Sequence, residues 1–291
     1  MKAARFDYVR PRSVEEACAC LAADADAAII AGGQTLVPMM AMRLARPSRL
    51  IDVARISELH GIRDDGAAVA VGAATRQATA LNDDTITRKV PLLALALPFV
   101  GHAATRNRGT VGGSVANADP AAEIALVLAT LGGHVALRNR SAQRSVAARD
   151  FFTGPMMTAM THGDCIVAVH FPVWRQGRIG VGFQEVSARR SDFALASAAA
   201  QVALDPSGQC TACALGIGGA AATPIRLDAV DALIGSPLSD RDITEAVRAA
   251  VASIEIMSSP HASDDYRRRA AATLSARALM QARDAARGTM Q

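Results

Sequence analysis

The sequence has few aromatic residues, since phenylalanine, tryptophan and tyrosine together make up 3% of its 291 residues. Its 31 Lys and Arg residues against 27 Asp and Glu residues leave a formal net charge of +4, and the arginines are scattered along the chain. A nucleic-acid surface usually combines a basic stripe with rings on which bases stack. Neither is present, so we expect no nucleic-acid partner.

Long apolar runs are also missing, although 51% of the residues are hydrophobic. No stretch of about 18 or more apolar residues is free of charge, and a helix needs about that length to span a bilayer. The first residues, Met1 to Asp7, are charged and offer no apolar core of a signal peptide. The sequence therefore predicts a cytoplasmic protein without a membrane span.

Cysteine is scarce as well, with five residues in the chain. An odd number argues against a disulfide framework in a cytoplasmic protein. Cys210 and Cys213 have CxxC spacing, but a zinc or iron–sulfur site would need two more ligands at matching spacing. The histidines are dispersed. We therefore expect buried, reduced thiols and no metal ligands, and we assign no catalytic residue.

Apolar runs are separated by polar and glycine-containing segments, and this pattern divides the chain into an N-terminal unit (residues 1–55), a middle unit (56–175) and a C-terminal unit (176–291). The N-terminal unit reads as β-α-β-α-β, with Ser13 to Glu16 as the capping box of its first helix. The middle unit reads as α+β. The C-terminal unit begins with three strand-like segments and ends with two helices. The predicted fold class is α+β.

The first informative motif follows a predicted buried strand that ends at Ile30, and it runs Ala31-Gly32-Gly33-Gln34-Thr35-Leu36. Glycines allow positive φ and let successive backbone N–H groups turn inward without a Cβ. Such a nest binds anions and suits a diphosphate. The alternative is a tight turn without a ligand, which is a common use of glycine.

The second motif holds another glycine pair, Gly112-Gly113, between the hydroxyl residues Thr110 and Ser114. A helix is predicted to begin near Pro120, with Glu123 in its first turn. The helix dipole stabilises a carboxylate at this position, so that Glu123 can remain ionised and could accept hydrogen bonds from a ribose diol.

Plainer interpretations also fit the second motif. Asp119 and Glu123 could serve only to cap the helix, and Arg106 and Arg108 could belong to a solvated turn. Two glycine turns about 80 residues apart nevertheless indicate one dinucleotide that is held from two sides.

With these motifs the sequence resembles the medium, FAD-binding subunit of the xanthine dehydrogenase and carbon monoxide dehydrogenase group of molybdenum hydroxylases. The resemblance spans the whole chain in order. Further matching segments are Phe183-Gln184-Glu185, Arg189-Arg190-Ser191-Asp192-Phe193-Ala194, Gly216-Ile217-Gly218-Gly219, Thr223-Pro224-Ile225-Arg226 and Tyr266-Arg267-Arg268.

The resemblance implies the fold of the vanillyl-alcohol-oxidase-like (PCMH-type) flavoproteins, with a two-part FAD-binding domain and a smaller C-terminal α+β domain. It implies FAD as the cofactor and two partner chains. A large subunit would hold molybdopterin and oxidise the substrate, and a small subunit would hold two 2Fe–2S clusters. The complex is expected to be a dimer of heterotrimers that passes electrons from the clusters through FAD to an external acceptor.

The resemblance also implies roles for individual residues. The diphosphate is expected on the two glycine motifs and near Asn117, the adenosine ribose on Glu123, and the isoalloxazine ring near Phe183 or Gln184. The xanthine dehydrogenase pattern has lysine in place of Gln184, which changes the expected charge beside the flavin. The complete candidate set is Ile30, Ala31, Gly32, Gly33, Gln34, Thr35, Leu36, Gly101, Thr110, Gly113, Ser114, Asn117, Glu123, Ile166, Phe183 and Gln184.

Three other functions are compatible with parts of the pattern. Gly216 to Ala221 match the G-x-G-x-x-A fingerprint of nicotinamide-dependent dehydrogenases, although Pro224 would break the helix that must follow. A free-standing FAD-dependent oxidase would normally carry a larger substrate domain than residues 176–291. A scaffold with degenerate flavin motifs would not need both glycine pairs.

Overall fold

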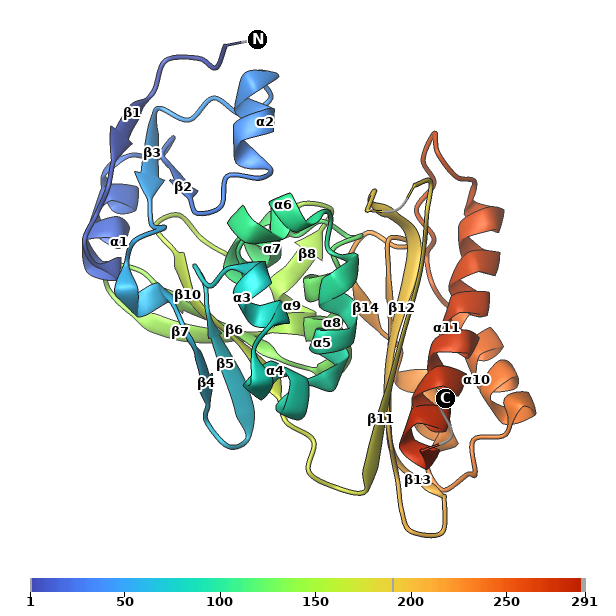
Figure 1. Ribbon diagram of the computed structural model, residues 1–291. Coiled ribbons are helices and arrows are strands. Elements are labelled where there is room, and N and C mark those ends of the chain that lie inside the picture. The colour runs from blue at the N-terminus through green and yellow to red at the C-terminus, as the bar shows by residue number, and fades with distance from the viewer. Residues whose placement is uncertain (1, 190, 289–291) are drawn as a thin grey trace.

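The computed structural model describes residues 2–189 and 191–288. Figure 1 shows the three units packed side by side in chain order, and the C-terminal sheet stands between the helices of the middle unit and α11. Helices and strands are mixed throughout the chain, which confirms the predicted α+β class.

The N-terminal unit is a small parallel sheet with two helices. The sheet has the strand order β1-β3-β2, and Ser13 caps the first helix by accepting a hydrogen bond from the backbone N–H of Glu16. This arrangement confirms the predicted β-α-β-α-β pattern. Its elements are β1 (Asp7–Val9), α1 (Val14–Ala23), β2 (Ala28–Ile30), α2 (Leu36–Ala41) and β3 (Arg49–Asp52).

The middle unit combines an antiparallel sheet, of strand order β4-β5-β10-β6-β7, with a group of short helices. Its strands are β4 (Ile62–Asp64), β5 (Ala68–Gly72), β6 (His134–Arg138), β7 (Gln143–Ala147) and β10 (Cys165–Pro172), and β8 (Phe152–Gly154) and β9 (Met157–Thr158) form a separate pair. Its helices are η1 (Ser57–Leu59), α3 (Gln77–Leu81), α4 (Asp84–Lys89), α5 (Pro91–Ala96), η2 (Leu97–Phe99), α6 (Ala103–Arg108), α7 (Val111–Asn117), α8 (Glu123–Leu131) and α9 (Ala148–Phe151).

Helix α8 lies at the centre of this unit, since every residue after Glu123 is buried. It begins at Glu123, whereas the sequence predicts a start near Pro120. The hydrophobic core around it extends to Val14 and Leu21 of helix α1, so the N-terminal and middle units share one core. The site described below therefore lies on a continuous packed base.

The C-terminal unit is an antiparallel sheet of strand order β11-β12-β13-β14 with two long helices. Its elements are β11 (Arg178–Ser187), β12 (Ala194–Leu204), β13 (Cys210–Gly218), β14 (Ile225–Arg226), η3 (Asp228–Leu233), α10 (Asp240–Ala252) and α11 (Asp264–Arg287). One face of the sheet packs on α11, and the other packs on α8 and α5 of the middle unit.

Glycines make both of these sheet contacts possible. A Cβ on Gly182 would lie 2.0 Å from the carbonyl oxygen of Ala278 in α11, and a Cβ on Gly216 would lie 2.0 Å from Thr130 Oγ1 in α8. Helix and sheet backbones therefore approach more closely than any side chain would permit. The segment that starts at Gly216 belongs to an antiparallel strand and is followed by another strand, β14, with no helix directly after it, and this excludes the nicotinamide-dependent fingerprint.

Among residues 2–189 and 191–288, no helix has the length and apolar character needed to cross a membrane. The same residues contain no group of three or more His, Cys, Asp or Glu side chains placed to bind a metal ion.

Candidate functional site

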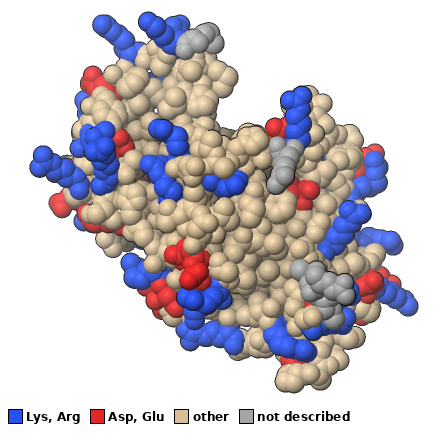
Figure 2. All heavy atoms as spheres, in the orientation of Figure 1, with Lys and Arg blue, Asp and Glu red and all other residues tan. Residues whose placement is uncertain are grey.

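The candidate site is a cavity of about 520 Å³ to which all three units contribute. Figure 2 shows this side of the molecule hollowed between the N-terminal unit and the upper end of the C-terminal sheet. The cavity is lined by the first glycine motif, the second glycine motif, the loop around Gly101, the start of β10 and the segment before β12. The sequence-predicted motifs are therefore brought together in one place.

The first glycine motif offers a row of free backbone donors. No described residue accepts a hydrogen bond from the backbone N–H groups of residues 32 to 36, and all five residues line the cavity. Gly33 has φ +69°, in the left-handed region that favours glycine. Consecutive free N–H groups are the structural requirement for an anion nest, so the geometry fits the diphosphate predicted here.

The second glycine motif does not form the predicted turn. Residues Val111–Asn117 are helix α7, whose N-cap Thr110 accepts a hydrogen bond from the backbone N–H of Gly113 at 3.0 Å. The N–H groups of Val111 and Gly112 donate to the carbonyl oxygens of Thr75 and Ala73. The prediction of a second glycine turn is therefore wrong, and the backbone N–H groups of Val111 and Gly112 are not free to bind a phosphate because they already donate within the protein.

Helix α7 still contributes a surface to the cavity. Gly113, Ser114, Ala116 and Asn117 line it on one side of the helix, and Gly113 and Ala116 are exposed. Their small side chains leave room for a ligand beside the helix. The side chains of Ser114 and Asn117 add polar groups that a phosphate or ribose could reach.

Arg106 fixes the rim of the cavity and is not part of a solvated turn. It lies in helix α6, and its Nη1 donates to the carbonyl oxygens of Val100 at 3.0 Å and Gly101 at 2.7 Å. Both Val100 and Gly101 line the cavity. One guanidinium thus holds the backbone of this loop in place.

Glu123 lies at the start of α8, as a lining residue of the cavity. Burial raises the pKa of its carboxyl group to about 7, and the nearby charge of Asp119 acts in the same direction. Burial at this position therefore opposes the ionisation that the helix dipole favours. Bound hydroxyl groups that donate to the carboxylate would favour its ionised form.

Phe183 and Gln184 do not line the cavity. Phe183 is 3% exposed, with its ring centroid 4.8 Å from that of Phe99. Gln184 points to the opposite face of the sheet, where its Nε2 donates to Oε1 of Gln281 in α11 at 2.8 Å. Neighbouring residues of a strand face opposite sides, so these two could not both face a ligand.

The segment Ser191 to Phe193 lines the cavity and is absent from the predicted set. Phe193 is 72% exposed, a high value for one of only seven phenylalanines. The sequence could have predicted Phe193 as a site residue, because Phe193 belongs to one of the segments that carry the family resemblance. Arg190 of the same segment lies outside the described residues. The lining residues missing from the predicted set also include Val53, Gln77, Val100 and Met160.

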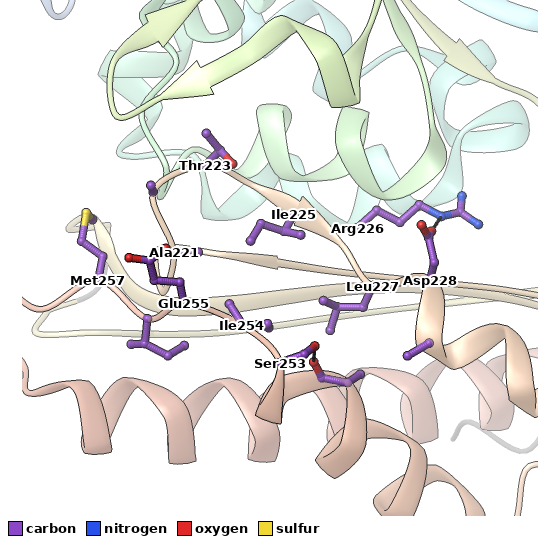
Figure 3. A pocket seen from close by; sticks show the side chains of 14 residues that line it. Ala221, Thr223, Ile225, Arg226, Leu227, Asp228, Ser253, Ile254, Glu255 and Met257 are labelled. Atoms are coloured by element: carbon purple, nitrogen blue, oxygen red, sulfur yellow. Dashed lines mark hydrogen bonds and ion pairs between the residues drawn. The ribbon is translucent and has the colours of Figure 1, made fainter.

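A second cavity, of about 500 Å³, lies in the C-terminal unit (Figure 3). It is bounded by β14, by η3 and by the segment that follows α10. Its cationic residue, Arg226, donates to Asp228 at 3.1 Å and to the carbonyl oxygen of Thr130 at 3.3 Å. Its charge is therefore engaged within the protein, and the motifs that resemble a nucleotide site lie elsewhere.

The first cavity fits an FAD molecule by the chemistry of its walls. It supplies free N–H donors for a diphosphate, a carboxyl group for a ribose diol, and apolar surface from Ile29, Ile166 and Phe193 for aromatic rings. A mononucleotide could not use the donor row, the carboxyl group and all of this surface together.

Comparisons with known proteins agree with this chemistry. Residues 4–174 match the family model described as the FAD binding domain in molybdopterin dehydrogenase, and residues 182–282 match the CO dehydrogenase flavoprotein C-terminal domain. The chain belongs to the family of FAD-binding medium subunits found in the xanthine dehydrogenase and carbon monoxide dehydrogenase group. The family resemblance and the FAD-binding class predicted from the sequence are confirmed.

Individual relatives match over nearly their full lengths. The 6-hydroxypseudooxynicotine dehydrogenase complex subunit alpha of Paenarthrobacter nicotinovorans is 38% identical, with 100% of this chain and 99% of the relative covered. The carbon monoxide dehydrogenase medium chain of Afipia carboxidovorans is 32% identical, with 96% of each covered. The crystal structure of quinoline 2-oxidoreductase from Pseudomonas putida 86 superposes with a TM-score of 0.92, at 35% identity and with 100% of both chains covered.

Proposed function

We propose that the chain binds one FAD in the cavity between its three units, with the diphosphate on the backbone N–H groups of residues 32 to 36. The carrying observation is this row of free donors in one cavity with Glu123. Glu123 would bind the adenosine ribose. The members of the predicted set that line the cavity are Ile30, Ala31, Gly32, Gly33, Gln34, Thr35, Leu36, Gly101, Thr110, Gly113, Ser114, Asn117, Glu123 and Ile166.

Bound FAD supplies the redox chemistry, since it accepts electrons from one partner and releases them to an acceptor. The chain's own residues bind and orient the cofactor. The turn at Gly33 holds the diphosphate, Arg106 fixes the loop at Gly101, and Phe193 can cover an aromatic ring. The acidic residues that line this cavity among the described residues are Asp119, Glu123 and Asp192, and no histidine or lysine lines it beside them to form an acid–base pair. We therefore place substrate oxidation on another chain.

The proposed partners follow from the family. A large subunit would carry molybdopterin, a small subunit would carry 2Fe–2S clusters, and two such heterotrimers would associate in the cytoplasm. Residues 1–55 and 56–175 would together form the FAD-binding domain, and residues 176–291 would form the C-terminal domain. The external electron acceptor and the substrate depend on those partner chains.

Purification from the native source tests this function. We expect the chain to copurify with two further polypeptides, with molybdenum, iron and FAD in the complex. The chain alone should oxidise neither aldehydes nor heteroaromatic compounds. Robust turnover by the metal-free chain would contradict the subunit assignment and favour the free-standing oxidase.

A further inference from the structure

Arg267 is a buried arginine near the beginning of α11, and only 6% of it is exposed. Its Nη1 donates to the carbonyl oxygen of Leu195 at 2.9 Å and also to the carbonyl oxygen of Gly219. Its Nη2 donates to Ser259 Oγ at 2.7 Å, which fixes the orientation of the guanidinium group. One side chain thus joins α11 to the start of β12 and to the residue that follows β13.

The contact with Leu195 holds the segment that precedes β12. Residues 191 to 193 line the cavity, and Leu195 follows them by two positions. In Figure 1 the beginning of α11 stands beside the upper end of β12, where this segment enters the strand. Arg267 therefore fixes the backbone that places Phe193 in the cavity wall.

The contact with Gly219 leads to another wall of the same cavity. The backbone N–H of Gly219 donates to the carbonyl oxygen of Pro120 at 2.7 Å. Asp119 and Glu123, on either side of Pro120 in the chain, line the cavity. The guanidinium group of Arg267 is therefore connected by two successive hydrogen bonds to the turn that carries Glu123.

The two walls meet at Gly219. Its φ is +72°, and a Cβ there would lie 2.8 Å from the carbonyl oxygen of Ala194. Glycine allows both this conformation and this close approach. The carbonyl groups of Leu195 and Gly219 are therefore near enough for one guanidinium group to bind both.

The burial of Arg267 is unfavourable for stability. The acceptors that the described residues offer it are two carbonyl oxygens and a hydroxyl group, none of them a carboxylate, and its Nε has no acceptor among them. A buried charge without a counter-charge is usually less stable than a well-packed apolar side chain. Natural proteins break such rules mainly at functional sites. The observations therefore favour a role of Arg267 in the site over a role in stability alone.

We propose that Arg267 is a positioning residue of the FAD site, which holds the segment of Phe193 in a fixed place relative to the turn of Glu123 without itself lining the cavity. This inference rests on the proposed function, because it takes this cavity as the FAD site. Without the guanidinium group the two walls are free to shift, and one bound cofactor no longer contacts Phe193 and Glu123 at the same time. FAD affinity then falls although both contact residues are unchanged.

The test is the dissociation constant of FAD for the deflavinated full chain, measured by quenching of flavin fluorescence. Arg267→Met removes the donors and keeps most of the side-chain length. Its Kd should be at least about tenfold above that of the wild type, the factor expected when the site loses one charge-assisted hydrogen bond.

Arg268→Met is the matched control. The Nη1 of Arg268 also donates to two carbonyl oxygens, those of Val251 at 3.2 Å and Ile254 at 3.3 Å, and neither residue lines the cavity. This variant should bind FAD as tightly as the wild type.

A double-mutant cycle separates positioning from general destabilisation. Because Arg267 acts through Phe193, its replacement should matter less in a chain that also carries Phe193→Ala. The Kd of this double variant should be at least about twofold lower than the value expected if the effects of the two single variants multiply, which is the lower limit for coupled residues. A loss of stability alone would leave the two effects independent.

Arg267→Lys provides a second variant if Arg267→Met does not fold. It keeps the charge but lacks the planar fork that binds several acceptors at once, so its Kd should also exceed that of the wild type. The positioning role is overturned if the folded variant binds FAD like the wild type, if Arg268→Met is weakened equally, or if the effects at Arg267 and Phe193 multiply. A wild-type chain that binds no FAD would instead overturn the proposed function, and this inference with it.

Discussion

The carbonyl oxygen of Arg108 lies 2.3 Å from the position that a Cβ would occupy on Gly32. Gly32 belongs to the first glycine motif and Arg108 directly precedes Gly109 of the second, so this contact joins two segments that are about 80 residues apart. Gly32 is needed for this close approach, whereas Gly33 is needed for its positive φ. Two adjacent glycines therefore serve different purposes.

Gly32→Ala should abolish FAD binding while the fold remains intact. The added Cβ must displace the backbone around Arg108, which separates the donor row from helix α7. Absorbance of bound flavin after reconstitution gives the measurement. Gly154→Ala is the control, because a Cβ there would meet only Met157 at ordinary contact distance, 3.5 Å. Equal flavin content in the two variants would show that the approach of the two motifs is not required.

Gly113→Val should also prevent FAD binding. The branched side chain would meet Thr110 Oγ1, 2.7 Å from the Cβ position, and would extend from α7 into the cavity. Circular dichroism should show a folded protein, since Gly113 is exposed on the cavity side. Retention of FAD with wild-type affinity would mean that α7 does not border the cofactor.

Phe193→Ala should weaken FAD binding by about 1 kcal/mol, the usual contribution of an aromatic contact, which corresponds to roughly a fivefold higher Kd. Phe193 lines the cavity and is 72% exposed without a ligand, so a bound ring can cover it. Phe6→Ala serves as the control, because Phe6 is 41% exposed and does not line the cavity. The same Kd in both variants would exclude Phe193 from the site.

Asp164 should make the protein sensitive to acid. Burial alone would raise the pKa of Asp164, but hydrogen bonds from Thr161, Arg144 and Asn139 outweigh burial and lower it. A carboxyl group with a lowered pKa contributes stability above its unfolded-state pKa of about 3.9 and loses it as the pH falls through the folded-state value.

Asp164→Asn should therefore reduce the free energy of unfolding at pH 7 by about 2 kcal/mol, in line with the loss of a hydrogen-bonded charge. The difference from the wild type should shrink below pH 4, as chemical denaturation at several pH values would show. A constant difference down to pH 2 would contradict the assigned role of Asp164. The residue directly precedes Cys165 and Ile166 in the cavity wall, so FAD affinity should fall as well.

Local patterns were sufficient to predict the elements with strong signals. Ser13 marks the start of α1, the three strand-like segments that open the C-terminal unit are β11, β12 and β13, and the five elements of the N-terminal unit occur in the predicted order. The family motifs were sufficient to predict the residues of the first glycine motif and Glu123 as site residues, and the structure brings them together in one cavity.

What could not be predicted depends on contacts between distant segments. Helices α3, α4, α6 and α7 span only five to seven residues each, too short for an apolar period to appear. The carbonyl groups of Ala73 and Thr75 occupy the N–H groups of the second motif, and no local pattern reveals that. The orientation of Gln184 is set by Gln281, which lies 97 residues further along the chain.

The cavity borders all three units, so a bound cofactor would act as a mechanical link between them. A ligand that binds only the folded state stabilises it by about 1.4 kcal/mol for each tenfold excess of its free concentration over Kd. The loop after β2 has backbone N–H groups without hydrogen-bond acceptors on the cavity side. Bound cofactor would therefore stabilise this edge of the N-terminal sheet more than the other parts of the cavity wall. The supply of FAD during synthesis would then govern how much of the polypeptide escapes proteolysis, before any electron is transferred.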